Sequence, residues 1–250
     1  MLNPQITTWL AALEQRHLAN LTRSEVTRAL RALSSCYVER RDKLGSGAAL
    51  EGAGKRAAFA LFYGPQHFFT TTEVLRALDA QARPLHTIHD LGCGTGVAGA
   101  AWALACDRQP SVVGIDRSAW AAAEASWTYR ELGVRGRAKS GDAVRGYPHA
   151  AADTAILLAY TVNELPDDQR ALLLEKVIDG VQRGAALLIV EPIAKRDRPW
   201  WPEWATRLTG LGAREDEWRF RADLPVSLRH FAKGAGLDAT ELKARTLSRI

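Results

Sequence analysis

A glycine-rich loop between a predicted strand and a predicted helix is the segment best suited to bind a ligand. It reads His89-Asp-Leu-Gly-Cys-Gly-Thr-Gly-Val97, after an apolar run and before an alanine-rich helix. Glycine lets the backbone turn sharply and lets a ligand approach the main chain closely. Gly94-x-Gly96-x-x-Gly99 also fits a dinucleotide fingerprint, which alone is a weak signal. The carboxylate of Asp90 at the loop entrance would repel a pyrophosphate, so the loop favours a cationic ligand.

Two more acidic residues follow later predicted strands. Asp116 ends the apolar run 112–116. Asp142 belongs to Ser140-Gly-Asp-Ala143, at the end of a weaker predicted strand over 137–141. A carboxylate can accept hydrogen bonds from two neighbouring hydroxyls. Ligands of open α/β sheets bind outside the carboxyl ends of the strands, so these acids point to a single site.

Asp90-Leu-Gly-Cys-Gly-Thr-Gly96 closely resembles the first motif of class I S-adenosylmethionine-dependent methyltransferases, D/E-x-G-x-G-x-G. The resemblance covers roughly residues 86 to 192 and implies S-adenosyl-L-methionine as the cofactor. It implies that Asp90 serves the amino-acid end of the cofactor, Asp116 the ribose, and Asp142 with the next amide the adenine. The expected cofactor-binding residues are Asp90, Gly92, Cys93, Gly94, Thr95, Gly96, Asp116, Arg117, Asp142, Ala143, Tyr160, His67 and Phe68.

The segment after the fourth predicted strand, Ala159-Tyr-Thr-Val-Asn-Glu-Leu-Pro166, contains the candidate catalytic residues. In the methyltransferase fold this position faces the sulfonium, so Tyr160, Asn163 and Glu164 are expected to contact the methyl acceptor. Glu164 or His67 is the candidate base if the reaction uses one. Alternatively, the segment only starts the next helix. It differs from the Asn/Asp-Pro-Pro-Tyr/Phe clamp of many base amino-group methyltransferases, so that chemistry is not expected.

Two aromatic stretches offer further contacts. His67 and Phe68 would close over the cofactor, because aromatic faces attract a sulfonium. Alternatively, they form a hydrophobic connection between the helical region and the sheet. A tryptophan group after the fifth predicted strand would form a stacking platform for a planar substrate, or pack onto the core. It consists of Trp200, Trp201 and Trp204.

Residues 160–165 and Leu188-Ile-Val-Glu-Pro192 resemble a narrower group, the methyltransferase-like proteins associated with the small ribosomal subunit. Those proteins also have a helical N-terminal region that ends in an aromatic, proline-containing segment, for which 62–70 is the counterpart. The chain lacks the cysteine set that many members carry for an iron–sulfur cluster, and its glycine loop lacks their usual proline. The group implies ribosomal RNA or the small subunit as partner. A small-molecule acceptor and a non-catalytic ribosome-assembly factor are the alternatives.

The predicted elements that must position these residues alternate between short apolar runs and helical segments from residue 86 onward. This alternation predicts an α/β fold, a Rossmann-like, doubly wound and mainly parallel sheet. The first eighty residues are predicted to be helical, with a capping box at Thr22-Arg-Ser-Glu25 and a helix end at Gly64-Pro65. We expect a helical cap or substrate region at 1–82 and the methyltransferase domain at 83–250. The last helix is predicted over 224–235 and the last strand over 241–247.

The composition of the 250 residues excludes several protein classes. Hydrophobic residues make up 47% and charged residues 24%, which excludes a wholly disordered, collagen-like or coiled-coil chain. No apolar run approaches the roughly 18 to 20 residues that span a bilayer, and no signal-peptide pattern opens the sequence, so a cytoplasmic protein is expected. The three cysteines form no C-x-x-C pair, so no metal site is expected. The net charge of +5 fits either a polyanionic partner or arginine-rich codon usage.

Overall fold

The computed structural model describes residues 3–39, 50–193 and 199–250, and it divides the chain into two compact units. The first unit comprises Met1–Phe69 and Phe220–Leu242, and the second comprises Thr70–Arg219 and Lys243–Ile250. This partition differs from a division at residues 82/83, because the chain returns to the first unit near its C-terminal end. As a division into functional regions, 1–82 and 83–250 stays a prediction.

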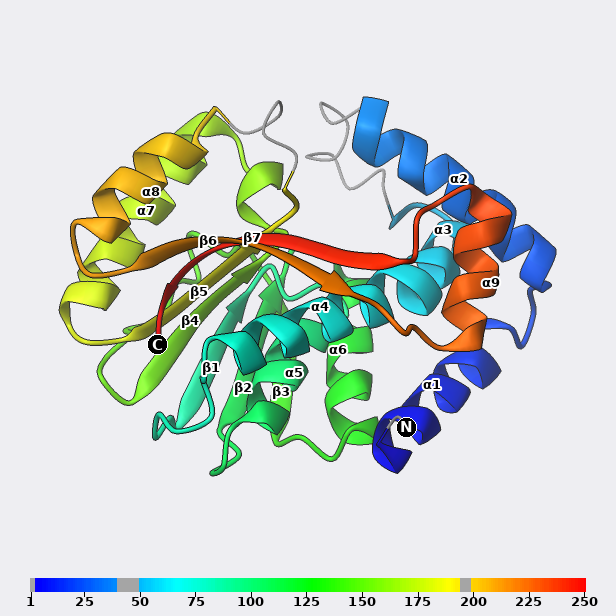
Figure 1. Cartoon of the computed structure of the whole chain (residues 1–250), viewed down its shortest axis with the longest axis horizontal. Helices are drawn as coiled ribbons and strands as arrows, with labels where there is room; N and C mark the ends of the chain where they lie inside the picture. The colour runs from blue at the N-terminus through cyan, green and yellow to red at the C-terminus, as the bar shows by residue number, and fades with distance from the viewer. Residues whose placement is uncertain (1–2, 40–49, 194–198) are drawn as a thin grey trace. The chain divides into compact units, whose positions relative to one another are not determined.

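The second unit is built on a sheet of seven strands among the described residues, in the order β3-β2-β1-β4-β5-β7-β6 (Figure 1). The strands are β1 Thr87–Leu91, β2 Ser111–Asp116, β3 Gly136–Ser140, β4 Thr154–Ala159, β5 Ala186–Glu191, β6 Arg214–Arg221 and β7 Glu241–Arg249. Neighbours from β3 to β5 pair in parallel, whereas β7 pairs antiparallel with β5. The mainly parallel α/β prediction is confirmed. The strand order reverses at β1 and β4, which is where such sheets bind ligands.

Helices cover both faces of this sheet, which explains why β4 and β5 are continuous apolar runs. Helices α5 (Val97–Ala105) and α6 (Ala119–Glu131) pack on β1, β2 and β3. Helices α7 (Asp167–Gln182) and α8 (Trp201–Thr209) lie side by side, away from α5 and α6 (Figure 1). A continuous apolar core joins α7 and α8 to alternate positions of the strands, and includes Ile156, Leu158, Val177, Leu187, Ile189 and Trp204.

Strand β6 has no counterpart in the sequence-based prediction. Its sequence, Arg-Glu-Asp-Glu-Trp-Arg-Phe-Arg, alternates exposed residues with half-buried ones. This edge strand is covered on one face, so only Trp218 and Phe220 are apolar. Two apolar residues are too few to show the alternation of apolar and polar positions by which a strand is recognised in a sequence. Strand β7 is confirmed and continues two residues beyond the expected end.

The first unit consists of helices among its described residues. They are α1 (Pro4–His17), α2 (Arg23–Glu39), α3 (Ala53–Ala58), the first turns of α4 (Gly64–Ala77) and α9 (Val226–Ala235). The capping box of α2 is confirmed, since the Glu25 amide donates to Thr22 Oγ1 (3.3 Å) and the Thr22 amide donates to Glu25 Oε2 (2.7 Å). The bond from the Thr22 amide lowers the pKa of Glu25, and a bond from the Thr22 hydroxyl to Glu25 Oε2 (2.7 Å) adds to this effect. Helix α9 packs on α2, where Arg31 Nε donates to the Gly234 carbonyl (2.9 Å).

The expected helix end at Gly64-Pro65 is wrong. A π-helical turn, Phe59–Tyr63, joins α3 to α4, and the Gly64 amide donates to the Phe59 carbonyl five residues earlier. Pro65 therefore lies in the first turn of α4, where a proline needs no amide hydrogen. The wider π turn lets the helical path continue through a proline that would break an α-helix.

Candidate active site

The glycine loop leaves β1 in a left-handed backbone conformation that requires glycine at several positions. Gly92 has a φ of 73° and Gly96 a φ of 78°. A side chain on Gly92 would collide with that of Thr161, whose hydroxyl donates to the Gly92 carbonyl (3.1 Å). A Cβ on Gly96 would lie 2.9 Å from the Cα of Ala125 on α6. The loop is thus packed between the end of β4 and helix α6.

Asp116, at the carboxyl end of β2, ties this loop to the sheet. Its Oδ2 accepts from the Gly94 amide (2.9 Å) and its Oδ1 from the Ser118 amide (2.8 Å). Burial raises the pKa of Asp116, and these two amide bonds oppose that rise. Each carboxylate oxygen can accept a further hydrogen bond, because it has two lone pairs.

Asp90 lies beneath the loop and is only 1% exposed. Its Oδ2 accepts from the Gly99 amide of α5 (3.2 Å), whereas its Oδ1 has no hydrogen-bond partner within the described ranges. Burial raises the pKa of Asp90 to about 7, and the nearby Asp116 adds to the rise. A buried carboxylate oxygen without a donor is rare in proteins, and a cation or a hydrogen-bond donor would satisfy it.

The turn after β3 brings the next predicted residues to the same edge of the sheet. Asp142 Oδ1 accepts from the amides of Val144 and Arg145 (2.9 Å each), and Ala143 is buried. The Gly141 amide donates to the Asp116 carbonyl (2.9 Å), so this turn adjoins the end of β2. Among the other predicted residues, Cys93 and Thr95 are buried in the glycine loop and Arg117 is exposed.

The segment after β4 begins in a strained conformation. Tyr160 has a φ of 59°, which costs a residue other than glycine about 1–3 kcal/mol. Its amide donates to the Val190 carbonyl of β5 (2.8 Å), and this bond holds the turn against the sheet. A short 3-10 turn over Val162–Glu164 follows, and α7 begins only at Asp167. Asn163 and Glu164 therefore precede the helix rather than start it.

Three acidic side chains come together at the ends of β2, β4 and β5. The pKa of Glu164 is raised to about 8, first by burial and then by the neighbouring carboxylates of Asp116 and Glu191. The exposed Arg117 partly offsets this rise. The Asn163 amide donates weakly to Glu191 Oε1 (3.4 Å), and Trp200 Nε1 approaches Asn163 Oδ1 (3.5 Å). The fold thus brings the predicted acceptor residues beside the predicted ribose acid.

The part of the sequence that contains the glycine loop, Asp116 and Glu164 matches a known protein family. Residues 88–184 match the model of a family described as a methyltransferase domain. The matched residues run from β1 to the end of α7, within the second unit. The predicted enzyme class and the predicted cofactor, S-adenosyl-L-methionine, are confirmed. No curated protein matches the sequence.

Solved methyltransferase structures share the fold of this chain. The mitomycin 7-O-methyltransferase MmcR is 15% identical with a TM-score of 0.54, over 99% of this chain and 76% of its own. A candidate O-methyltransferase from Nostoc punctiforme is 14% identical with a TM-score of 0.51, over 90% of this chain and 69% of its own. An S-adenosylmethionine-dependent O-methyltransferase from Thermotoga maritima is 18% identical with a TM-score of 0.48, over 72% of this chain and 64% of its own. At these identities the first two establish the fold alone.

Glu191 is an acid at this edge of the sheet that sequence reasoning did not assign to the site. It is 1% exposed and ends β5. The signal that would have identified it is the one used for Asp90 and Asp116, an acid at the end of an apolar parallel strand. Thr161, which fixes the carbonyl of Gly92, has no comparable sequence signal because its role depends on contact between two loops.

His67 and Phe68 belong to the first unit. The ring centroid of Phe68 lies 5.2 Å from that of Trp9, and the His67 ring lies 6.0 Å from that of Tyr63. Burial lowers the pKa of His67 to about 3, so its imidazole is neutral near pH 7. The expected contact of both residues with the cofactor stays a prediction.

The tryptophan group packs into the core of the second unit rather than forming an exposed stacking platform. Trp200, Trp201 and Trp204 are all less than 10% exposed, and their rings contact one another. The Arg245 guanidinium lies 4.5 Å from the centroid of the Trp201 ring. These contacts leave the ring faces engaged with other side chains.

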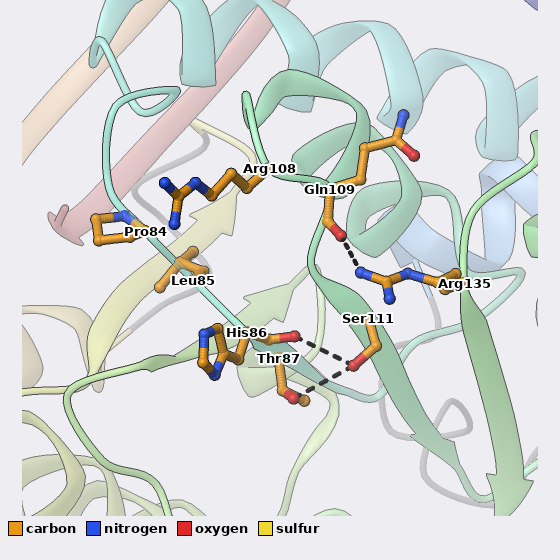
Figure 2. A pocket seen from close by; sticks show the side chains of 8 residues that line it. All are labelled: Pro84, Leu85, His86, Thr87, Arg108, Gln109, Ser111 and Arg135. Atoms are coloured by element: carbon orange, nitrogen blue, oxygen red, sulfur yellow. Dashed lines mark hydrogen bonds between the residues drawn. The ribbon is translucent and has the colours of Figure 1, made fainter.

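Three further observations concern the described ranges alone. No helix there is long and apolar enough to cross a membrane. No group of His, Cys, Asp or Glu in those ranges could hold a metal ion. A polar hollow lies at the amino ends of β1 and β2, the edge of the sheet opposite to the acids, and Figure 2 shows its lining.

The glycine loop yields a stability test. Replacing Gly96 with Ala should cost about 1–2 kcal/mol for the left-handed backbone and about 1–3 kcal/mol more for the collision with Ala125. Gly236→Ala is the matched control, because its φ is 73° but its Cβ would meet nothing within 4 Å. Urea unfolding of both variants measures the difference. Equal losses would contradict the tight packing of the loop on α6.

Proposed function

We propose that this chain transfers the methyl group of S-adenosylmethionine to an RNA acceptor held beside Glu164. The observation that carries the proposal is the position of Glu164, where burial and then the nearby carboxylates of Asp116 and Glu191 raise its pKa to about 8. Asp116 is the proposed ribose ligand, so Glu164 would lie next to the cofactor. A cytoplasmic location is part of this proposal.

The residues at the carboxyl edge of the sheet fit the proposed cofactor. The unpartnered Oδ1 of Asp90 suits the cationic amino-acid end, and the free lone pairs of Asp116 suit the ribose hydroxyls. The turn that Asp142 and Ala143 form beside Asp116 suits the adenine. Gly92, Cys93, Thr95 and Gly96 would line the loop around the ligand, with Gly94 fixed by Asp116.

The proposed roles on the acceptor side follow from the same geometry. When bound, S-adenosylmethionine supplies a methyl group on a sulfonium, which a nucleophile attacks from the opposite side. The chain must hold that nucleophile in line and exclude water. Glu164 would accept the acceptor's proton, and its raised pKa makes it a stronger base near neutral pH than an ordinary carboxylate. Tyr160 and Asn163, whose backbone amides donate to the Val190 carbonyl and the Glu191 carboxylate of β5, would orient the acceptor.

The distribution of charge supports RNA as the acceptor. The first unit contains 12 basic and 8 acidic residues by sequence, against 21 and 20 in the second unit, so it accounts for +4 of the net +5. Arginine, which makes up 26 of the 33 basic residues, binds phosphate through a planar fork. The resemblance of residues 160–165 and 188–192 to small-ribosomal-subunit proteins supports the same choice, and the comparisons with known proteins add nothing to it.

A small neutral molecule is the second candidate acceptor. Asp90, Asp116, Glu164 and Glu191 concentrate negative charge at the proposed site. A phosphate close to these acids would be repelled, whereas a neutral acceptor would not. A ribosome-assembly factor without methyl transfer is the third possibility, and it predicts no product with any acceptor.

Methyl transfer from labelled S-adenosylmethionine to a cell extract, with and without ribonuclease, separates these acceptors. We expect the label in a ribonuclease-sensitive product, and transfer that weakens steeply with salt because phosphate contacts release counterions. Label in small molecules that survives ribonuclease would favour the second candidate. Absence of any labelled product, with normal cofactor binding, would favour the assembly factor.

Replacing Asp116 with Ala should weaken cofactor binding by on the order of tenfold or more. The reason is the loss of charge-assisted hydrogen bonds worth roughly 1.5–3 kcal/mol. Calorimetric titration with S-adenosylmethionine measures the change, and circular dichroism checks that the variant is folded. Unchanged affinity in a folded variant would remove Asp116 from the cofactor site.

Replacing Glu164 with Gln should leave cofactor affinity nearly normal and reduce the methylation rate roughly 10²-fold or more. The wild-type rate at limiting S-adenosylmethionine should rise as the pH increases through about 8, because this rate reports the free enzyme, in which Glu164 accepts a proton only when it is ionised. The variant should lack this rise. Asp168→Asn is the matched control, since that acid is exposed in the first turn of α7. Wild-type rates in both Glu164→Gln and Asn163→Ala would place the acceptor elsewhere.

A further inference from the structure

Strand β3 is an edge strand with basic side chains at alternate positions. Its sequence is Gly-Arg-Ala-Lys-Ser, and Arg135 precedes it. Arg135 continues the sheet, since its carbonyl accepts from the Val112 amide of β2 (2.8 Å). Because successive residues of a strand point to opposite faces, Arg135, Arg137 and Lys139 share one face.

This face is the one that α6 does not cover. A Cβ on Gly136 would lie 2.7 Å from the Tyr129 ring of α6, so the even-numbered positions of β3 face that helix. Arg137 and Lys139 therefore point away from α6, and both are exposed.

The turn after β3 adds a fourth basic residue beside this face. Lys139 is paired with Ile115 of β2, and the backbone at Gly141 and Gly146 packs against the Ile115 side chain. Arg145 belongs to this turn and is exposed. The turn thus continues the basic face toward the carboxyl edge, where Ser140 is paired with Asp116.

At the amino edge of the sheet, the polar hollow contributes a fifth basic residue. Arg108, from the connection between α5 and β2, lines this hollow together with Arg135 (Figure 2). The Arg135 guanidinium donates to the Gln109 carbonyl (2.7 Å), which holds it in place. The basic row, defined as Arg108, Arg135, Arg137, Lys139 and Arg145, therefore extends from one edge of the sheet to the other.

Most of the basic row is not neutralised by the protein. Within the described ranges, the side chains of Arg108, Arg137, Lys139 and Arg145 form no ion pair or hydrogen bond, whereas Arg76, Arg207 and Arg214 each pair with a carboxylate. Charged residues commonly protect an edge strand from pairing with another chain. That purpose accounts for the strand residues and leaves Arg108 and Arg145, which lie outside the strand, unexplained.

We propose that the basic row binds the phosphates of a single-stranded RNA segment and leads it to the carboxyl edge of the sheet. Side chains on one face of a strand repeat about every 6.6 Å, so the row offers successive contacts to an extended backbone. Its last members lie beside Asp116, so the nucleotide following the bound phosphates reaches the acids of the site. The choice of RNA over another polyanion rests on the proposed function.

A matched pair of triple variants tests the row. The row variant is Arg137→Gln, Lys139→Gln and Arg145→Gln, and the control is Arg76→Gln, Arg207→Gln and Arg214→Gln. Both lose three positive charges from exposed side chains; they differ in where the charge is removed and in that the control arginines pair with carboxylates. Fluorescence anisotropy measures binding of a labelled single-stranded RNA of mixed sequence between about 50 and 200 mM salt.

We expect the row variant to lower the slope of log affinity against log salt by about 2, at about 0.7 per phosphate contact. Affinity should fall on the order of 50-fold at about 0.15 M salt, while the control keeps the wild-type slope and S-adenosylmethionine binding is normal in both. Equal behaviour of the two variants, or no RNA binding by the wild type, overturns the inference. So does polyglutamate that displaces RNA from the row as effectively as unlabelled RNA.

The methyl-transfer assay distinguishes this inference from the proposed function. Row-dependent RNA binding with a ribonuclease-resistant methylated product would support the row and reject RNA as the acceptor. Ribonuclease-sensitive methylation with unchanged RNA binding by the row variant would support the acceptor and reject the row.

Discussion

Each oxygen of Asp116 accepts a hydrogen bond from a backbone amide, one from Gly94 in the glycine loop and one from Ser118 at the start of α6. The loop has few side chains of its own with which to hold its shape, so its conformation depends on this carboxylate and on the hydroxyl of Thr161. The end of β2, the turn after β3 and the segment after β4 all meet around these bonds. The geometry of the site therefore follows from how a single acid satisfies the amides around it.

The same arrangement concentrates negative charge in a place with little water. Asp90 and Glu164 respond with pKa values near 7 and 8, because burial and neighbouring carboxylates both disfavour the ionised form. A cationic ligand would reverse this balance by favouring the ionised carboxylates. The excess of acids thus matches a ligand with a sulfonium and an ammonium group better than it matches a pyrophosphate.

The parts of this site that could be predicted from sequence are those set by strand ends. Asp90, Asp116 and Asp142 follow recognisable strands, and parallel strands bring their carboxyl ends to one edge. Glu191 obeys the same rule and was missed because the resemblance used as a guide assigns no role to it. Strand β6 was missed because it buries too few apolar residues to show the alternation typical of a strand. The helix that continues through Pro65 was missed because a π turn has no recognisable amino-acid composition. The joining of 220–242 to the helical unit depends on contacts between distant segments, which no local pattern records.

That joining has a consequence for how the chain folds. Arg31 and Gly234, which are hydrogen-bonded in the first unit, are 203 residues apart in sequence. Helix α2 is synthesised long before α9, the helix on which it packs, and closing so long a loop is slow compared with forming local contacts. The first unit cannot complete its core until nearly the whole chain has left the ribosome. The sheet also stays incomplete until then, because β7 follows α9 in the sequence. The two units are therefore coupled in biogenesis, and a chain that stops short of residue 220 completes neither.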